Sequence, residues 1–142
     1  MLNEDTNSNN PAIQDAREKA KQSCKELAQR MLALLPTVEE GLDKISAQLD
    51  SQQIGSSVLM LQDIASAIDS YANAMETVFF ENDDIDKVTA PLLDVQEGLG
   101  MLIAKYEAGD IGIVKAYFNN EFKPLFRKFS QALQENLGEA LI

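Results

Sequence analysis

Apolar side chains recur every three or four residues along most of this chain, the spacing that places them on one face of an α-helix. Pro11 follows Asn10 and suits the first turn of a helix, whereas Pro36 pushes the residue before it out of the α region. We therefore predict a first helix over 11–35. Its apolar stripe comprises Ile13, Ala16, Ala20, Cys24, Leu27, Met31 and Leu34.

Two further stripes follow. Thr37 and Glu40 have the spacing of a capping box, in which each side chain satisfies a free backbone N–H of the other residue. This pattern predicts a second helix over 37–53, with Val38, Leu42, Ile45 and Leu49 turned inward. Ser56 or Ser57 then caps a third helix over 57–80. Its stripe is the most regular in the chain and comprises Leu61, Ile64, Ile68, Tyr71, Met75 and Val78.

The outer face of the third helix is composed of small, weakly polar residues rather than Lys and Glu. Such a face lets another helix approach closely, either within the same bundle or from a second copy or partner. The residues are Ala65, Ser66, Ala67, Ser70, Ala72, Asn73 and Ala74.

A fourth stripe surrounds Pro91, which either kinks its helix or marks the helix's first turn. We prefer a short turn at 84–89 and a helix over 90–108. Gly109 ends this helix in the left-handed conformation, and Asp110 caps the next one. Because the connection is so short, the two helices must be antiparallel. The stripe comprises Ile85, Val88, Leu92, Val95, Leu99, Leu102 and Tyr106.

The last predicted helix, over 111–137, contains two residues that break helical rules. Pro124 lies in its interior, where a proline costs about 3 kcal/mol. Glu121 lies beside the aromatic stripe, where a carboxylate must be paired, hydrogen-bonded or at the edge of the bundle. These features either fix the packing or form a binding edge. The candidate residues are Tyr117, Phe118, Glu121, Phe122, Pro124 and Phe126.

Together these elements predict an all-α protein, an antiparallel bundle of four to five helices. We expect a disordered tail at 1–10, where polar turn-forming residues dominate, and a single domain over 11–142. The predicted core comprises Leu27, Met31, Leu42, Ile45, Leu61, Ile64, Ile68, Met75, Val95, Leu99, Leu102, Val114, Phe118, Leu125 and Phe129.

The composition removes most catalytic chemistry. The 142 residues include no histidine and a single cysteine, Cys24. Triads that need His, His-containing metal sites, iron–sulfur clusters and an intramolecular disulfide are therefore excluded. The acidic segment 81–86 lacks the glycine and the final glutamate of an EF-hand. We predict no catalytic residue, no metal site and no cofactor, and hence no enzyme.

The net charge of −11 disfavours nucleic acid and anionic membranes as partners and permits a basic protein. Between Lys44 and Lys87 the chain has no Lys or Arg. The N-terminus lacks the pattern of a signal peptide, and no apolar run approaches the ~20 residues of a membrane span. These features predict a cytoplasmic protein.

The segment that runs from Gly109-Asp110 through Tyr117-Phe118 and Glu121-Phe122 to Pro124-Leu125 resembles a motif of small uncharacterised helical proteins from low-GC Gram-positive bacteria. Their motif runs approximately Gly-Asp-Tyr, Glu-Tyr-Glu-Leu and then x-Pro-x-Leu. This chain departs from it at Ile111 and at 119–120. The resemblance implies a helical bundle and no assigned activity. Flagellar export chaperones are similar in size, acidity and helix count, which is a likeness of fold alone.

The function that these features predict is a non-enzymatic interaction module, an adaptor or a chaperone-like protein that binds a helical or basic protein segment. The alternative is a structural homo-oligomer, such as a homodimer, that associates through the small-residue face of the third helix.

Overall fold

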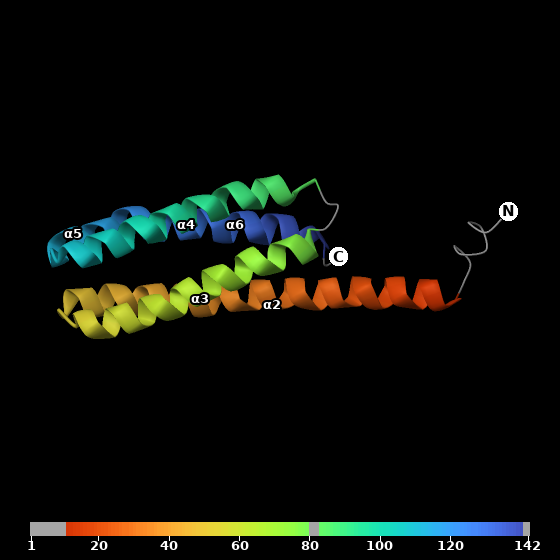
Figure 1. Cartoon of the computed structure of the whole chain (residues 1–142), viewed down its shortest axis with the longest axis horizontal. Coiled ribbons are helices and arrows are strands. Elements are labelled where there is room, and N and C mark those ends of the chain that lie inside the picture. The colour runs from red at the N-terminus through yellow and green to blue at the C-terminus, as the bar shows by residue number, and fades with distance from the viewer. Residues whose placement is uncertain (1–10, 80–82, 141–142) are drawn as a thin grey trace.

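Two antiparallel helical hairpins, stacked on one another, make up the molecule (Figure 1). The computed structural model describes residues 11–79 and 83–140, so the predicted tail at 1–10 lies outside the described residues. The described part of the chain is helical apart from the turns between its helices and has no strand, which confirms the all-α prediction. Its elements are α2 (Pro11–Asp50), α3 (Ile54–Val78), α4 (Ile85–Ala108), α5 (Ile111–Tyr117), the π-helical turn η1 (Phe118–Phe122) and α6 (Lys123–Ala140).

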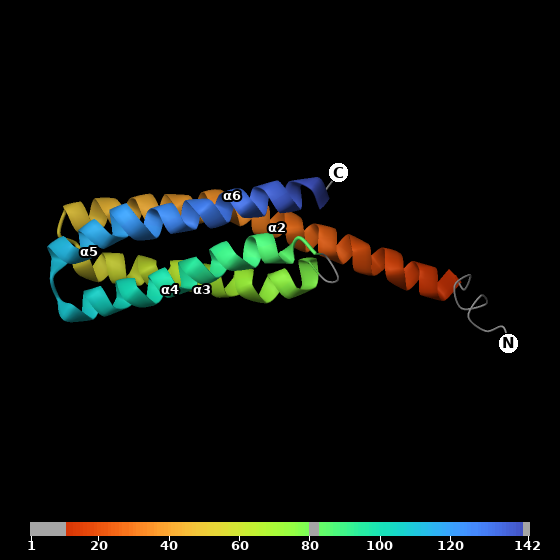
Figure 2. The same ribbon diagram turned by 90° about the horizontal axis from the view of Figure 1, so that it is seen from above.

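The first hairpin pairs α2 with α3, and the second pairs α4 with the run from α5 to α6 (Figures 1 and 2). Large apolar side chains fill the space between the two layers. The four phenylalanines of η1 and α6 are completely buried, and the ring of Tyr71 meets that of Phe129 edge-on at 5.2 Å. Burial of each such side chain contributes about 1.5–3 kcal/mol, so these rings provide much of the stability of the interface.

Helix α2 passes through Pro36 without ending, so the predicted division into helices 11–35 and 37–53 is wrong. Thr37 therefore lies inside the helix and caps nothing. Leu35 and Val38 are buried on either side of the proline, while Pro36 itself is exposed. Because the same face of α2 is buried before and after the proline, packing offsets the roughly 3 kcal/mol that an interior proline costs.

Pro91 also lies inside its helix, since α4 begins at Ile85 and not near residue 90. Val88 is completely buried and Leu92 nearly so, one on each side of the proline. The first turns of α4 therefore belong to the core, and the predicted turn at 84–89 is wrong. A proline early in a helix is tolerated more easily than one at its centre, because fewer upstream carbonyls lose their donors.

The connection between α2 and α3 is a tight turn in which Gln52 has a φ of 60°. The N–H of Gln53 donates to the carbonyl of Gln48 and that of Gln52 to Leu49, the two hydrogen bonds of a Schellman motif. Helix α3 then begins at Ile54, three residues before the predicted start at 57. Ser57 is buried inside α3, where its hydroxyl donates to the carbonyl of Ile54, so it is not the cap.

The turn between α4 and α5 matches its prediction. Gly109 has a φ of 83°, and its N–H donates to the carbonyl of Tyr106. The Asp110 carboxylate accepts from the backbone N–H of Ile113 at 3.2 Å, as an N-cap does.

The predicted last helix, 111–137, is continuous but contains the π-helical turn η1. From Val114 through Phe118 and Phe122 to Phe126, buried side chains recur every four residues. Three such steps exceed three α-helical turns by about one residue. In η1 the N–H of Lys123 donates to the carbonyl of Phe118, five residues back, which accommodates that extra residue.

The core prediction is largely confirmed. Of the predicted core residues, Leu27, Leu99 and Leu125 are only half-buried, and all the others are buried. Leu125 packs against α4 at Gly98, where an added Cβ would lie 2.7 Å from the Leu125 Cδ1. Gly98 thus allows α4 to approach η1 and α6 closely.

The first part of α2, residues 11–26, begins beyond the ends of the other helices and reaches the bundle at Cys24 (Figures 1 and 2). We call this segment the α2 overhang. Apart from Ile13 and Cys24, which are half-buried, all of its residues are exposed. The overhang meets the bundle at Cys24, whose thiol donates to the carbonyl of Thr77.

Candidate functional site

The six candidate residues of the last helical segment do not form one surface. Phe118, Phe122 and Phe126 are completely buried in the core between the layers. Tyr117 and Pro124 are half-buried, and Pro124 is the second residue of α6, directly after η1. This segment therefore packs the bundle, as one of its two interpretations expected.

Glu121 is exposed, so it is not the buried carboxylate that a catalytic role at this position would require. Its charge acts on the hydroxyl of Tyr117. The ammonium of Lys105 lies 5.1 Å from the centre of the Tyr117 ring, a cation–π contact between α4 and α5. Burial, and then the negative charge of Glu121, raise the pKa of the Tyr117 hydroxyl. Tyr117 therefore stays protonated at neutral pH and acts as a packing residue.

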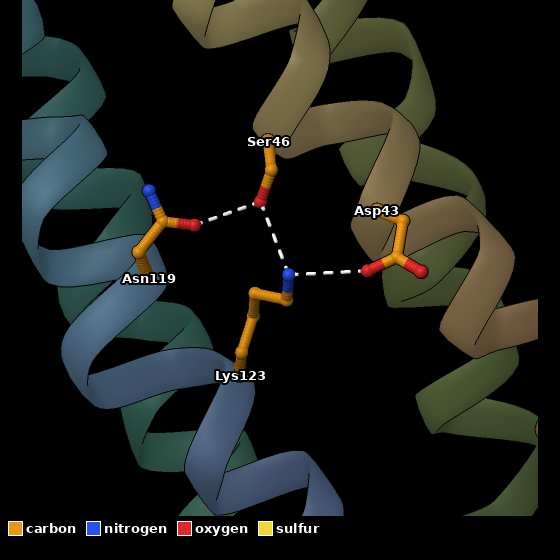
Figure 3. Close-up of polar contacts among 4 residues, drawn as sticks. All are labelled: Asp43, Ser46, Asn119 and Lys123. Carbon is orange, nitrogen blue, oxygen red and sulfur yellow. Dashed lines mark hydrogen bonds and ion pairs between the residues drawn. The ribbon is translucent and has the colours of Figure 1, made fainter.

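A polar cluster connects η1 and α6 to α2 (Figure 3). The hydroxyl of Ser46 donates to the Asn119 side-chain oxygen at 2.7 Å. The Lys123 ammonium donates to Ser46 at 3.2 Å and to the Asp43 carboxylate at 3.1 Å. Because Lys123 and Asn119 are already engaged by α2, this cluster joins the layers and offers no free chemistry.

An apolar groove of about 430 Å³ lies on the seam between the start of α3 and the end of α4. We call it the α3–α4 groove. At its edge the Tyr106 hydroxyl donates to the Ser57 Oγ at 3.0 Å, which joins the two helices. Burial raises the pKa of Tyr106, and the hydrogen bond between Tyr106 and Ser57 partly opposes this rise. The lining residues are Ile54, Val58, Leu61, Gln62, Ala65, Ile103, Tyr106 and Glu107.

Two of the large exposed apolar side chains, Val58 and Ile103, line this groove. Of all such side chains in the described residues, all but Leu93 belong to the start of α3, the end of α4 or α5, and therefore to one end of the bundle. A second hollow of about 360 Å³, between α4 and α5, includes Met101 and Ile113. The side chains at this end are Val58, Leu59, Met101, Ile103 and Ile113. A concentration of this kind is typical of a surface that binds another protein.

The charges beside the groove are acidic. Helix α3 contains no Lys or Arg, and its Gln62, Asp69 and Glu76 follow one another at seven-residue steps. Seven residues are two helical turns, so these side chains share the flank of α3 that lines the groove. Glu107 contributes a carboxylate from α4. The seam between α3 and α4 is thus an apolar hollow followed by a row of acids.

The large exposed apolar residues at this end of the bundle were not among the site residues predicted from the sequence. Val58, Leu59, Met101, Ile103 and Ile113 lie off the core stripes of their helices, and the prediction followed the stripes. The sequence did contain one signal of exposed apolar surface, namely an apolar residue at a position outside the stripe. That signal identifies single residues, and only the packing of α3 beside α4 brings them together.

Within residues 11–79 and 83–140, no group of three or more Cys, Asp or Glu side chains is placed to hold a metal ion. Glu81 and Asn82 of the acidic segment lie outside the described residues. No helix in the described part of the chain has the length and hydropathy required to cross a bilayer.

Comparison with known proteins gives one match. The profile of the family described as "Domain of unknown function (DUF8042)" matches residues 26–132. The matched region begins where α2 enters the bundle and includes α3, α4 and most of α6. Neither the curated proteins nor the solved structures contain a match to this chain. Since the matched region covers most of its length, the chain belongs to the DUF8042 family.

Proposed function

We propose that this protein is a non-enzymatic interaction module that binds an amphipathic helix of a partner protein in the α3–α4 groove. The observation that carries this proposal is an apolar groove, lined by the exposed Val58 and Ile103, at the end of the bundle where most of the large exposed apolar side chains of the described residues lie. Soluble proteins rarely expose contiguous apolar patches of this kind without a binding role. Grooves between helices commonly accept the apolar face of a third helix.

The charge around the groove supports a basic partner. Asp69 and Glu76 continue the groove flank of α3, and Glu107 lies at the groove on α4. A helix with apolar residues at three- and four-residue steps, flanked by Lys or Arg, would match both the hollow and the acids. Charge complementarity of this type mainly increases the association rate and the specificity of binding.

Self-association through the small-residue face of α3 has less support. Ala67, Ala72 and Ala74 of that face pack against the core of the same chain. Ser66, Ser70 and Asn73 remain exposed, and they supply little apolar surface to bury. This homo-oligomer is the alternative, and sedimentation velocity of the full chain tests it.

The test uses two designed helical peptides with identical apolar faces, one with Lys and Arg at its polar positions and one with Glu. Fluorescence anisotropy with the full chain should show binding of the basic peptide and much weaker binding of the acidic one. Ile103→Glu places a charge in the groove and should weaken binding about tenfold or more, since a buried isoleucine contributes about 1.5–3 kcal/mol.

The matched control is Leu93→Glu. Leu93 lies on the same helix and is also exposed, but it does not line the groove. This variant should bind the basic peptide like the unmodified protein, and circular dichroism should show both variants folded. Equal binding of the two peptides, or equal losses in the two variants, would contradict the proposal.

A further inference from the structure

The α2 overhang has the chemistry that the groove is proposed to recognise. Its Ile13, Ala16 and Ala20 continue the helical stripe that is buried farther along α2. Beside this stripe Arg17, Lys21 and Lys25 form a basic row at four-residue steps. Residues four apart on a helix share one flank, so the overhang is an amphipathic helix with a basic edge.

The acids of the overhang do not neutralise this edge. Asp15, Glu18 and Glu26 occupy the side of the helix opposite the stripe. Lys19 forms an ion pair with Asp15 at 3.3 Å, on the other flank. Arg17, Lys21 and Lys25 are all exposed. The basic row therefore faces solvent, beside the apolar stripe.

The overhang cannot reach the groove of its own chain. It lies at one end of the bundle, whereas the groove, made by the start of α3 and the end of α4, lies at the other (Figures 1 and 2). Helix α2 is continuous from Pro11 to Asp50, so the overhang has no hinge on which to fold back. Only a second molecule can bring an overhang and a groove together.

We infer that the α2 overhang of one copy docks in the α3–α4 groove of a second copy. The apolar stripe of Ile13, Ala16 and Ala20 enters the hollow, and the basic row from Arg17 to Lys25 lies along the acidic flank, with one end toward Glu107 and the other toward Asp69 of the other molecule. Small alanines let the helix lie close to the groove. An isolated helix of this length is only marginally stable in water, so docking also stabilises the overhang.

The contact joins two different surfaces, and two arrangements follow from it. Two antiparallel copies can exchange overhangs and close as a two-fold dimer, or successive copies can extend as an open chain. Direct contact between two identical grooves is disfavoured, because it would set acid against acid. This inference rests on the proposed role of the groove, and it identifies the chain itself as one ligand of that site.

The test is sedimentation velocity of the full chain over a range of protein concentrations and at two salt concentrations. We expect species heavier than the 15.7 kDa monomer, with an association that weakens as salt screens the charges. The double variant Arg17→Glu/Lys21→Glu should be monomeric, and so should Glu107→Lys/Asp69→Lys. An equimolar mixture of these two variants should associate again, because the reversed charges are complementary.

The control variant is Glu18→Lys, on the back of the overhang, which should associate like the unmodified protein. All the altered side chains are exposed, so circular dichroism should show every variant folded. A monomeric unmodified protein overturns the inference. Association that persists in both double variants also overturns it and favours the small-residue face of α3.

A synthetic peptide of residues 11–27 separates this inference from the proposed function. If the designed basic peptide binds and the 11–27 peptide does not, the groove keeps its proposed role and the self-docking inference fails. If neither peptide binds, both proposals fail. Binding of the 11–27 peptide that is lost in Ile103→Glu supports both.

Discussion

At the scale of single residues, two glycines of α4 differ in the space available for an added methyl group. Gly98 is buried where α4 meets η1 and α6, and an added Cβ there would lie 2.7 Å from Leu125 and 3.5 Å from Phe122. Gly100 is exposed and has nothing within 4 Å of the corresponding position. Both residues lower the helical propensity of α4, but only Gly98 is required for close packing.

We therefore predict opposite roles for the two glycines. Gly100→Ala should raise the free energy of unfolding by about 0.5–1 kcal/mol, because alanine loses less backbone entropy in a helix. Gly98→Ala should be less stable than Gly100→Ala by about 1–3 kcal/mol, since the added methyl overfills the contact with Leu125. Urea unfolding measures both values, and equal stabilities would show that Leu125 moves aside freely.

At the scale of elements, the π-helical turn η1 reconciles the aromatic stripe with the helical repeat. Val114 faces the core before the turn, Phe118 and Phe122 face it within the turn, and Phe126, Phe129 and Leu133 face it afterwards. A straight α-helix would rotate the residues after the turn away from the direction of the residue before it. The extra residue in η1 removes this rotation, and so both ends of one long helical segment are buried.

Because η1 accommodates one extra residue, two single-residue deletions should have different effects. Both are made in a Pro124→Ala background, which allows an uninterrupted α-helix. Deletion of Asn120 should convert η1 to regular α-helix and leave Phe126 and Phe129 facing the core. Deletion of Arg127 should rotate Phe129 and Leu133 by about 100° and abolish cooperative unfolding. Circular dichroism during thermal unfolding distinguishes the two, and equal damage would mean that η1 has another role.

At the scale of the whole molecule, the two layers are joined by an aromatic core and by a few polar contacts of unequal burial. The Lys123 side chain, from α6, is only 14% exposed and donates to Asp43 and Ser46 of α2. In the ion pair between Lys115 of α5 and Asp50 of α2, the lysine side chain is 47% exposed. Water and salt screen the second contact far more than the first.

Lys123→Met should consequently lower the free energy of unfolding by about 1–2 kcal/mol, because it removes the hydrogen bonds that the largely buried Lys123 side chain donates to Asp43 and Ser46. Lys115→Met should cost at most about 1 kcal/mol, and this cost should decrease in high salt. Chemical unfolding at low and high salt measures both. A larger loss for the Lys115 variant would contradict the assigned role of the polar cluster.

The amino-acid sequence by itself determined the all-α class, the inward faces of the helices and the turn at Gly109 and Asp110. These features depend on local spacing and on caps, which act within a few residues. Only the tertiary structure decided that α2 and α4 continue through Pro36 and Pro91, that Glu121 faces solvent, and that a groove separates α3 from α4. Each of these outcomes depends on burial supplied by residues distant in the chain. Such burial can outweigh the local cost of a proline, and it alone determines which apolar side chains remain exposed together.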